Sequence, residues 1–154
     1  MRIFRFLCGL LLAGVCGAAA AVPFRINTSQ GLAFGSFVAA SGGSVTVSPA
    51  GLRTASGAVT LISSDGGRPA AFIVSGNNNW TYTITLPSQA TLVNANGQTM
   101  VLNHFTSTPS DSTASSGLLS GGSQMLYVGA TLQVNANQAS GSYSGSFTVI
   151  VDNP

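Results

Sequence analysis

The chain has 154 residues, of which 45% are hydrophobic and only 5% are charged, and its formal net charge is +2. All of its positive side chains are arginines, and the sequence contains neither lysine nor glutamate. Typical globular chains are about 25% charged. This chain therefore lacks both the basic patch that neutralises the phosphates of nucleic acids and the polybasic segment that binds anionic lipids. We expect no nucleic-acid partner.

The first 21 residues have the three parts of a secretory signal peptide. Arg2 and Arg5 precede an apolar stretch over residues 6–15, and small residues end the segment at Ala21. A membrane anchor would need about 20 continuous apolar residues followed by a charged stop, and the sequence has neither. We expect cleavage after Ala21 and export to the periplasm, the cell surface or the medium, with no transmembrane segment in the mature chain.

Removal of this leader changes the chemistry of the remaining chain, residues 22–154. Both cysteines, Cys8 and Cys16, leave with the leader, so the mature chain has no disulfide, no thiol nucleophile and no thiolate ligand. Lipidation of Cys16 is disfavoured because Val15 is larger than the residue expected before a lipidated cysteine. Three arginines then balance three aspartates, and the remaining length predicts a single domain.

Short stretches of alternating apolar and polar residues follow the leader, and none has helical spacing. The apolar residues that define the first strand faces are Val45 and Val47, Val59 and Leu61 after an expected turn at residues 53–57, and Phe72 and Val74. The clearest strand is residues 80–87, where Tyr82, Ile84 and Leu86 share one face and threonines occupy the other. Such a period of two is typical of a half-buried β-strand.

Residues 91–102 predict a hairpin, because Asn96-Gly97 accepts the positive φ angles of a type I′ turn. The tetrapeptide V-N-A-N that contains this turn recurs at residues 134–137, which we interpret as shared hairpin chemistry. Residues 106–123 are polar and predict an exposed loop, after which a strand resumes.

The chain closes with another alternating stretch, residues 141–154, which follows an expected hairpin turn at residues 135–141. One face of this strand holds Tyr143, Gly145, Phe147, Val149 and Val151, and only Ile150 breaks the rule on the polar face. About eight to ten strands at a spacing of about 10 residues predict an all-β, immunoglobulin-like antiparallel sandwich over residues 22–154.

Few residues in this chain are suited to catalysis. His104 is the single histidine and is expected near the surface, on the same strand face as Leu102. There is no Gly-x-Ser-x-Gly turn, and three isolated aspartates supply neither paired carboxylates nor a zinc or calcium cluster. We expect no catalytic, cofactor-binding or metal-binding residues and no enzymatic activity.

Trp80 and Tyr82 are the alternative candidates for ligand contact. A ring exposed next to the asparagines of residues 77–79 would be able to stack on a sugar. Trp80 and Tyr82 are in register with Ile84, however, and this register favours a role in the core or at the end of the sheet.

Residues 32–51, 58–64, 81–88 and 129–153 together resemble the exported bacterial family known as domain of unknown function 4402. The resemblance spans essentially all of the mature chain and rests on turn and strand motifs rather than on a catalytic signature. It implies an exported all-β domain and brings no established activity.

The end of the chain also resembles secreted pilin-type subunits, in which an N-Q-x-x-G-x-Y-x-G turn leads into an alternating last strand. In chaperone-assembled pilins, an incomplete sandwich leaves a groove that the N-terminal extension of the next subunit fills. Residues 22–28 are the candidate donor here. This chain departs from the pilin pattern because it has no disulfide and ends in Asp-Asn-Pro. The candidate assembly residues are Phe24, Ile26, Tyr143, Phe147, Val149 and Val151.

We therefore expect an exported, non-enzymatic structural or cell-surface protein, such as a fimbria-like subunit that assembles by β-strand addition. Its expected partners are further copies, other surface subunits or a periplasmic chaperone. The alternative is a self-complete sandwich that binds carbohydrate or a surface through Trp80 and Tyr82.

The leader gives the first testable prediction. When the whole chain is expressed with its leader in a secreting bacterium, the exported protein should begin at Val22 and should fail to react with a thiol reagent. Intact-mass measurement before and after thiol alkylation tests both points. A mature protein that retains Cys16 would contradict the prediction.

Overall fold

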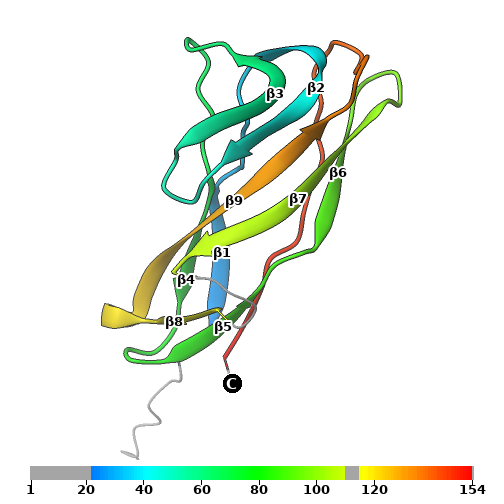
Figure 1. Cartoon of the computed structure of the whole chain (residues 1–154). Helices are drawn as coiled ribbons and strands as arrows, with labels where there is room; N and C mark the ends of the chain where they lie inside the picture. The colour runs from blue at the N-terminus through cyan, green and yellow to red at the C-terminus, as the bar shows by residue number, and fades with distance from the viewer. Residues whose placement is uncertain (1–21, 110–114, 154) are drawn as a thin grey trace, which may run out of the picture.

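The computed structural model describes residues 22–109 and 115–153, so the expected signal peptide lies outside the described residues. Within these ranges the chain forms ten β-strands and one short 3₁₀ helix, η3 (Figure 1). The elements in order are β1 (Arg25–Gln30), β2 (Phe37–Val47), β3 (Arg53–Leu61), β4 (Ala70–Ser75), β5 (Thr81–Thr85), β6 (Gln89–Val93), β7 (Thr99–Thr108), β8 (Ser115–Leu118), η3 (Ser120–Gly122), β9 (Ser123–Val134) and β10 (Ile150–Asp152).

Strand β9 is the centre of the larger, seven-stranded antiparallel sheet. Its residues 123–128 pair with β4, and residues 130–134 pair with β2. Strand β7 pairs with residues 127–133 of β9. Because most of these residues also pair with β4 or β2, β7 lies on the other edge of β9. The sheet continues through β1 beside β4, β3 beside β2 and β6 beside β7, while β10, β5 and β8 form the smaller sheet. The predicted all-β antiparallel sandwich is thus confirmed.

The strand order is that of an immunoglobulin-like sandwich. Strands β1, β4, β9 and β7 lie in the order A-B-E-D, and β5 pairs with β10 as strand C pairs with strand F. The β2–β3 hairpin is an addition between strands A and B. In the part of the chain that the structure describes, no strand lies where strand G would pair with β10.

Two hydrophobic clusters fill the sandwich, and β9 contributes to both. We name the clusters after their positions in Figure 1: Leu126 and Val128 belong to the lower cluster, and Leu132 and Val134 belong to the upper cluster. Every second residue from 126 to 134 is at most 4% exposed, as expected for a strand with one face in the core. The predicted inward face of β5 is confirmed, since Tyr82 and Ile84 are buried in the lower cluster.

The β6–β7 hairpin forms as predicted, but its turn type was predicted wrongly. Gly97 has φ +83°, whereas Asn96 is not among the residues with positive φ, as a type I′ turn would require. Instead Gly97 N–H donates to the Asn94 carbonyl and Asn94 N–H donates to the Gln98 carbonyl, at 3.1 and 2.9 Å. The Asn94 side chain closes the longer loop by accepting the amides of Asn96 and Gln98, each at 2.9 Å.

Two other local predictions were wrong. Residues 53–57 belong to strand β3 and the turn lies at residues 48–52, where Gly51 N–H bonds to the Ser48 carbonyl. The polar tract 106–123 contains the end of β7, all of β8 and the buried Leu119. Sequence polarity missed β8 because its pairing with β5 requires only backbone groups.

Packing along β9 gives a stability prediction. Leu126→Ala should lower the free energy of unfolding by about 2–5 kcal/mol, because it leaves a cavity in the lower cluster. Met125→Ala, on the adjacent residue whose side chain is 38% exposed, should change it by less than about 1 kcal/mol. Urea unfolding of both variants tests this contrast, and equal losses would contradict the assigned face of β9.

Candidate functional site

The C-terminal segment, residues 143–152, is extended and has one face in the core. Tyr143, Phe147, Val149 and Val151 are half-buried, whereas the residues between them, Ile150 included, are exposed. The Phe147 ring lies 5.1 Å from the Phe105 ring, centroid to centroid. The alternation read from the sequence is therefore confirmed for these four residues, whereas Gly145, expected on the same face, is exposed. Ile150 keeps to the outward face although it is apolar.

The partner of this segment is not the one that the hairpin prediction implied. The segment does not return beside β9. Residues 150–152 pair with residues 83–85 of β5, and Ser144 exchanges two backbone hydrogen bonds with Val93 at 2.8 and 3.0 Å. The chain crosses from one sheet to the other after β9, so the predicted final hairpin was wrong.

The hydrogen-bond ladder of the C-terminal segment is interrupted between these two contacts. Between these contacts the C-terminal segment has five residues, 145–149, whereas the stretch of the same chain that it runs beside has seven, 86–92. Pro87 lies in that longer stretch and has no N–H to donate. Gly145 packs so closely on residues 91–92 that a side chain at this position would meet the Thr91 carbonyl.

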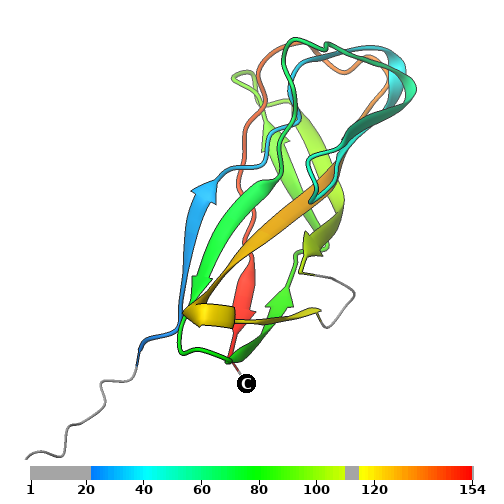
Figure 2. The same cartoon turned by 90° about the vertical axis from the view of Figure 1, so that its left-hand side faces the viewer.

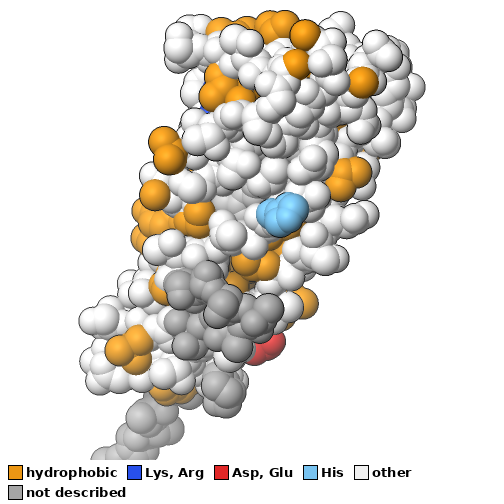
Figure 3. Space-filling view, viewed as in Figure 1, with side chains coloured by type: hydrophobic (Ala, Val, Ile, Leu, Met, Phe, Trp, Pro, Cys, Tyr) orange, Lys and Arg blue, Asp and Glu red, His pale blue; other side chains and the backbone are white. Residues whose placement is uncertain are grey.

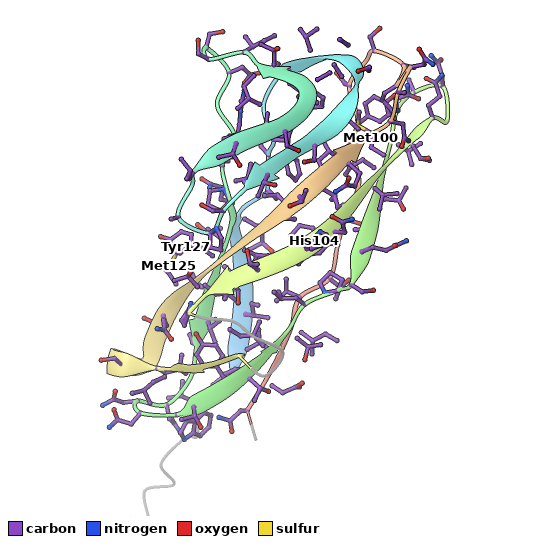
Figure 4. The ribbon with its side chains drawn as sticks, in the orientation of Figure 1. Met100, His104, Met125 and Tyr127 are labelled. Atoms are coloured by element: carbon purple, nitrogen blue, oxygen red, sulfur yellow. The ribbon has the colours of Figure 1, made fainter. Side chains whose placement is uncertain are left out.

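An apolar groove of about 700 Å³ runs beside the upper part of this segment. One wall is residues 32–39, the other is residues 138–145 with Phe147, and the floor is Met100, Leu102, Leu132 and Val134 of the upper cluster. Figure 4 shows Met100 at the upper part of β7. The groove lies beside residues 138–147, which precede β10 in the chain. Because strand G would pair with the strand equivalent to β10 in an immunoglobulin-like sandwich, we refer to this groove as the G groove.

Both walls of the G groove have backbone edges without a ladder. In wall 32–39, residues 37–39 pair with β3 on one edge, but β2 joins β9 only from Gly43 onward. The other wall continues into residues 145–149, which pair with no described strand, and then into β10, which is the outer strand of its sheet. Within residues 22–109 and 115–153, an added strand would thus find open edges on either side.

Arg53 holds the first wall in place. Its Nη2 donates to the carbonyls of Ser36 and Ile62, each at 3.0 Å, and its Nη1 donates to the carbonyl of Asp65. The Ser36 hydroxyl donates to the Asp65 carboxylate. Hydrogen bonds from a charged group are the stronger class, so Arg53 ties wall 32–39 to the loop that contains Asp65.

The predicted donor residues lie in the same chain's lower core. Strand β1 pairs antiparallel with β4, with Ile26 opposite Val74. Phe24 and Ile26 are half-buried against the lower cluster, and the Phe24 ring lies 6.3 Å from the Tyr82 ring. Phe147, Val149 and Val151 contact the same cluster. The structure thus brings five of the six candidate assembly residues to one core, but β1 and the C-terminal segment do not pair directly.

Tyr82 and Trp80, the alternative ligand contacts, lie in or against the lower cluster. Tyr82 has no exposed surface, and its hydroxyl donates to Gln124 Oε1 at 2.7 Å. Trp80 is half-buried against the lower cluster. No face of the Tyr82 ring is available to a sugar, which corrects its role as a ligand contact and agrees with the favoured core role.

His104 projects from β7 on the exposed face shown in Figures 3 and 4. It has φ +50° and lies where the β7–β9 register shifts between Asn103 and Thr106. Leu102 is buried and His104 exposed, so the expected shared face was wrong because a bulge intervenes. In the described part of the chain, no three residues of the kinds that ligate metals lie together.

Comparison with known proteins identifies one family. The family model described as domain of unknown function (DUF4402) matches residues 24–152, so the chain belongs to this family and the predicted resemblance is confirmed. No curated protein matches the chain. No solved structure matches it either. Among the described residues, no helix is long and apolar enough to cross a membrane.

Several parts of the site were not predicted. Wall 32–39 gave no sign of its role, because its residues line a groove only after β2 turns away from β9. Arg53 was a possible signal of a structural role, because charged residues are rare in this chain and all of its positive side chains are arginines. The only sequence signal of the open edge near Pro87 was this proline at the end of the clearest predicted strand, residues 80–87.

Burial of Tyr82 gives a prediction about pH. Desolvation raises the pKa of the Tyr82 phenol above its ordinary value of 10.0. The unfolded chain then releases this proton at a lower pH than the folded chain, so the corresponding stability is complete below about pH 10 and is lost as pH rises further.

Tyr82→Phe should remove that part of the pH dependence and cost about 1 kcal/mol at neutral pH, through loss of the bond to Gln124. Urea unfolding between about pH 8 and pH 11 measures both effects. The same loss of stability with rising pH in the variant and in the parent would contradict the assignment.

Proposed function

We propose that this protein is an exported, non-enzymatic structural or cell-surface protein that assembles by β-strand addition in the manner of a fimbria-like subunit. The observation that carries the proposal is the G groove, which is apolar at its floor and open at the backbone edges of both walls. A strand inserted there would gain ladder hydrogen bonds on both edges and would bury alternate side chains on the upper cluster.

The electrostatics of the mature chain favour such pairing. Soluble sheet proteins commonly protect an open edge with lysine or proline. The stretch from residue 138 to residue 151, which includes the second wall of the G groove, contains no charged residue and no proline. Figure 3 shows that the face of the molecule that carries His104 is also almost free of charged side chains. Nothing on this edge opposes the approach of another strand.

Strand β1 of a second copy is the proposed donor. No residue of β1 is fully buried, and β1 is paired on one edge only. Gly31, directly after β1, has open space around its Cα and can act as a hinge. Strands with few buried residues are the first to open, and β1 in the G groove would be paired on two edges instead of one.

Charge complementarity supports this donor. Arg25 is exposed and lies between Phe24 and Ile26, while Asp65 is exposed and lines the G groove. With Phe24 and Ile26 facing the floor, Arg25 would face outward toward the rim. An exposed ion pair contributes little affinity, so the pair would serve mainly to select the register of the inserted strand.

A disulfide lock tests strand addition by β1. Asn27 and Ile73 are opposite each other on β1 and β4, and antiparallel partners have Cα separations that suit a disulfide. In the double variant Asn27→Cys with Ile73→Cys, oxidation should hold β1 in its own chain and leave the protein monomeric, while reduction should restore assembly. The mass of the chain from Val22 in solution, measured beside a chain that starts at Gly31, reports the result.

The matched control is the single variant Asn27→Cys, kept reduced, which should assemble like the parent. Assembly of the oxidised lock would exclude β1 as the donor but leave the G groove as an acceptor of other strands. A cooperative monomer for the unlocked chain at all concentrations, also in the presence of a synthetic peptide of residues 22–30, would overturn strand addition itself.

A further inference from the structure

The two V-N-A-N turns, residues 93–96 and 134–137, meet at one end of the molecule. The loops after β6 and β9 lie together at the upper end in Figures 1 and 2, opposite the end where β1 begins and β10 finishes. Gln138 Nε2 in the second loop donates to the Thr99 carbonyl beside the first, at 3.2 Å. Between the loops is a hollow of about 320 Å³, which we call the tip hollow.

The lining of the tip hollow is entirely uncharged. Its residues are Gly97, Gln98, Thr99, Asn135, Ala136, Asn137, Gln138 and Ala139. There is no arginine to attract an anion, no carboxylate to hold a cation, and no large apolar side chain to anchor a lipid or an apolar peptide. The remaining chemistry consists of amides, one hydroxyl and backbone groups.

Hydrogen bonds within the loops hold these amides in place. Asn94 Nδ2 donates to Gln98 Oε1 at 2.7 Å, and Asn135 Nδ2 donates to Gln138 Oε1 at 3.3 Å. Gln138 Nε2 also donates to the Tyr143 hydroxyl at 2.8 Å. Among the described residues no hydrogen bond engages the side chain of Asn137, which is exposed and has φ +61°.

We infer that the tip hollow binds a neutral, polyhydroxylated ligand, namely an uncharged oligosaccharide. Each free amide offers both a donor and an acceptor, which matches the hydroxyl groups of a sugar, and the preformed loops reduce the ordering cost of binding. The hollow is shallow and open, so a sugar would contact it with one face and remain exposed to solvent on the other. The tip hollow adjoins the G groove, since Gln138 and Ala139 line both, but its free amides lie outside the groove.

Asn137→Gly provides a specific test, because glycine accepts the positive φ of this position and only the amide is lost. Asn79→Gly is the matched control: Asn79 is also exposed with φ +64°, but it lies in the β4–β5 loop at the other end of the molecule. The full exported chain would be applied to an array of neutral, sialylated and sulfated oligosaccharides. Each retained sugar would then be titrated by ¹⁵N-NMR, following the asparagine and glutamine side-chain amides.

We expect retention of neutral oligosaccharides, shifts of the Gln98 and Asn137 amides, and no dependence on salt concentration, since no charge lines the site. Asn137→Gly should weaken binding about tenfold, in keeping with the loss of one or two hydrogen bonds, while Asn79→Gly should bind as the parent does. Absence of any retained neutral sugar, retention of charged sugars alone, or unchanged binding by Asn137→Gly would each overturn the inference.

Discussion

The structure depends on one constraint, that each β-strand has two hydrogen-bonding edges and β9 uses both along most of its length. β4 and β2 share one edge in succession and β7 covers the other. Because alternate β9 side chains enter both hydrophobic clusters, a single strand joins the two halves of the sandwich. The other strands pair with the neighbours of β9 or form the smaller sheet, and β1, β3 and β10 therefore lie at sheet edges.

The edge beside the C-terminal segment is unlike the edges at β1 and β3. Arg25 and Arg53 start those two strands, whereas the stretch from residue 138 to residue 151 has no charged residue. Its own ladder is broken where five residues face seven across Pro87. An immunoglobulin-like sandwich pairs strand G with strand F, whereas here the described chain leaves an apolar floor and a backbone edge without a ladder at each wall. The proposed assembly rests on these backbone edges without ladder hydrogen bonds, not on any catalytic group.

The two ends of the molecule have different chemistry. The lower end carries the start of β1 and the end of β10, and its core holds the aromatic rings of Phe24, Trp80 and Tyr82. The upper end carries uncharged amide loops fixed by their own hydrogen bonds. An assembly joined through β1 and the G groove would use strand edges along the body of the sandwich. The tip hollow offers mainly side-chain amides and shares only Gln138 and Ala139 with the G groove, so the two proposals rest mostly on different groups.

Hydrophobic periodicity predicted the class of fold and the inward faces of the strands, because a period of two is a local property of the sequence. It predicted Tyr82 and Ile84 in the core, and it predicted the buried side of residues 143–151 correctly. Family membership also followed from local turn and strand motifs. Hydrophobic periodicity does not say which strand lies beside which, however, since backbone hydrogen bonds are the same for every residue except proline.

The pairing partners of the strands were set by the tertiary structure. It paired the last strand with β5 instead of β9, formed β8 from a polar tract and put His104 on the opposite face from Leu102 through a bulge. It also made residues 32–39 a wall of the G groove, and it placed residues 97–99 and 135–139, from the two loops that carry the V-N-A-N tetrapeptides, around one hollow. Each of these depends on contacts between residues far apart in the chain, where the free energy of packing the whole sandwich selects the arrangement and local preference does not.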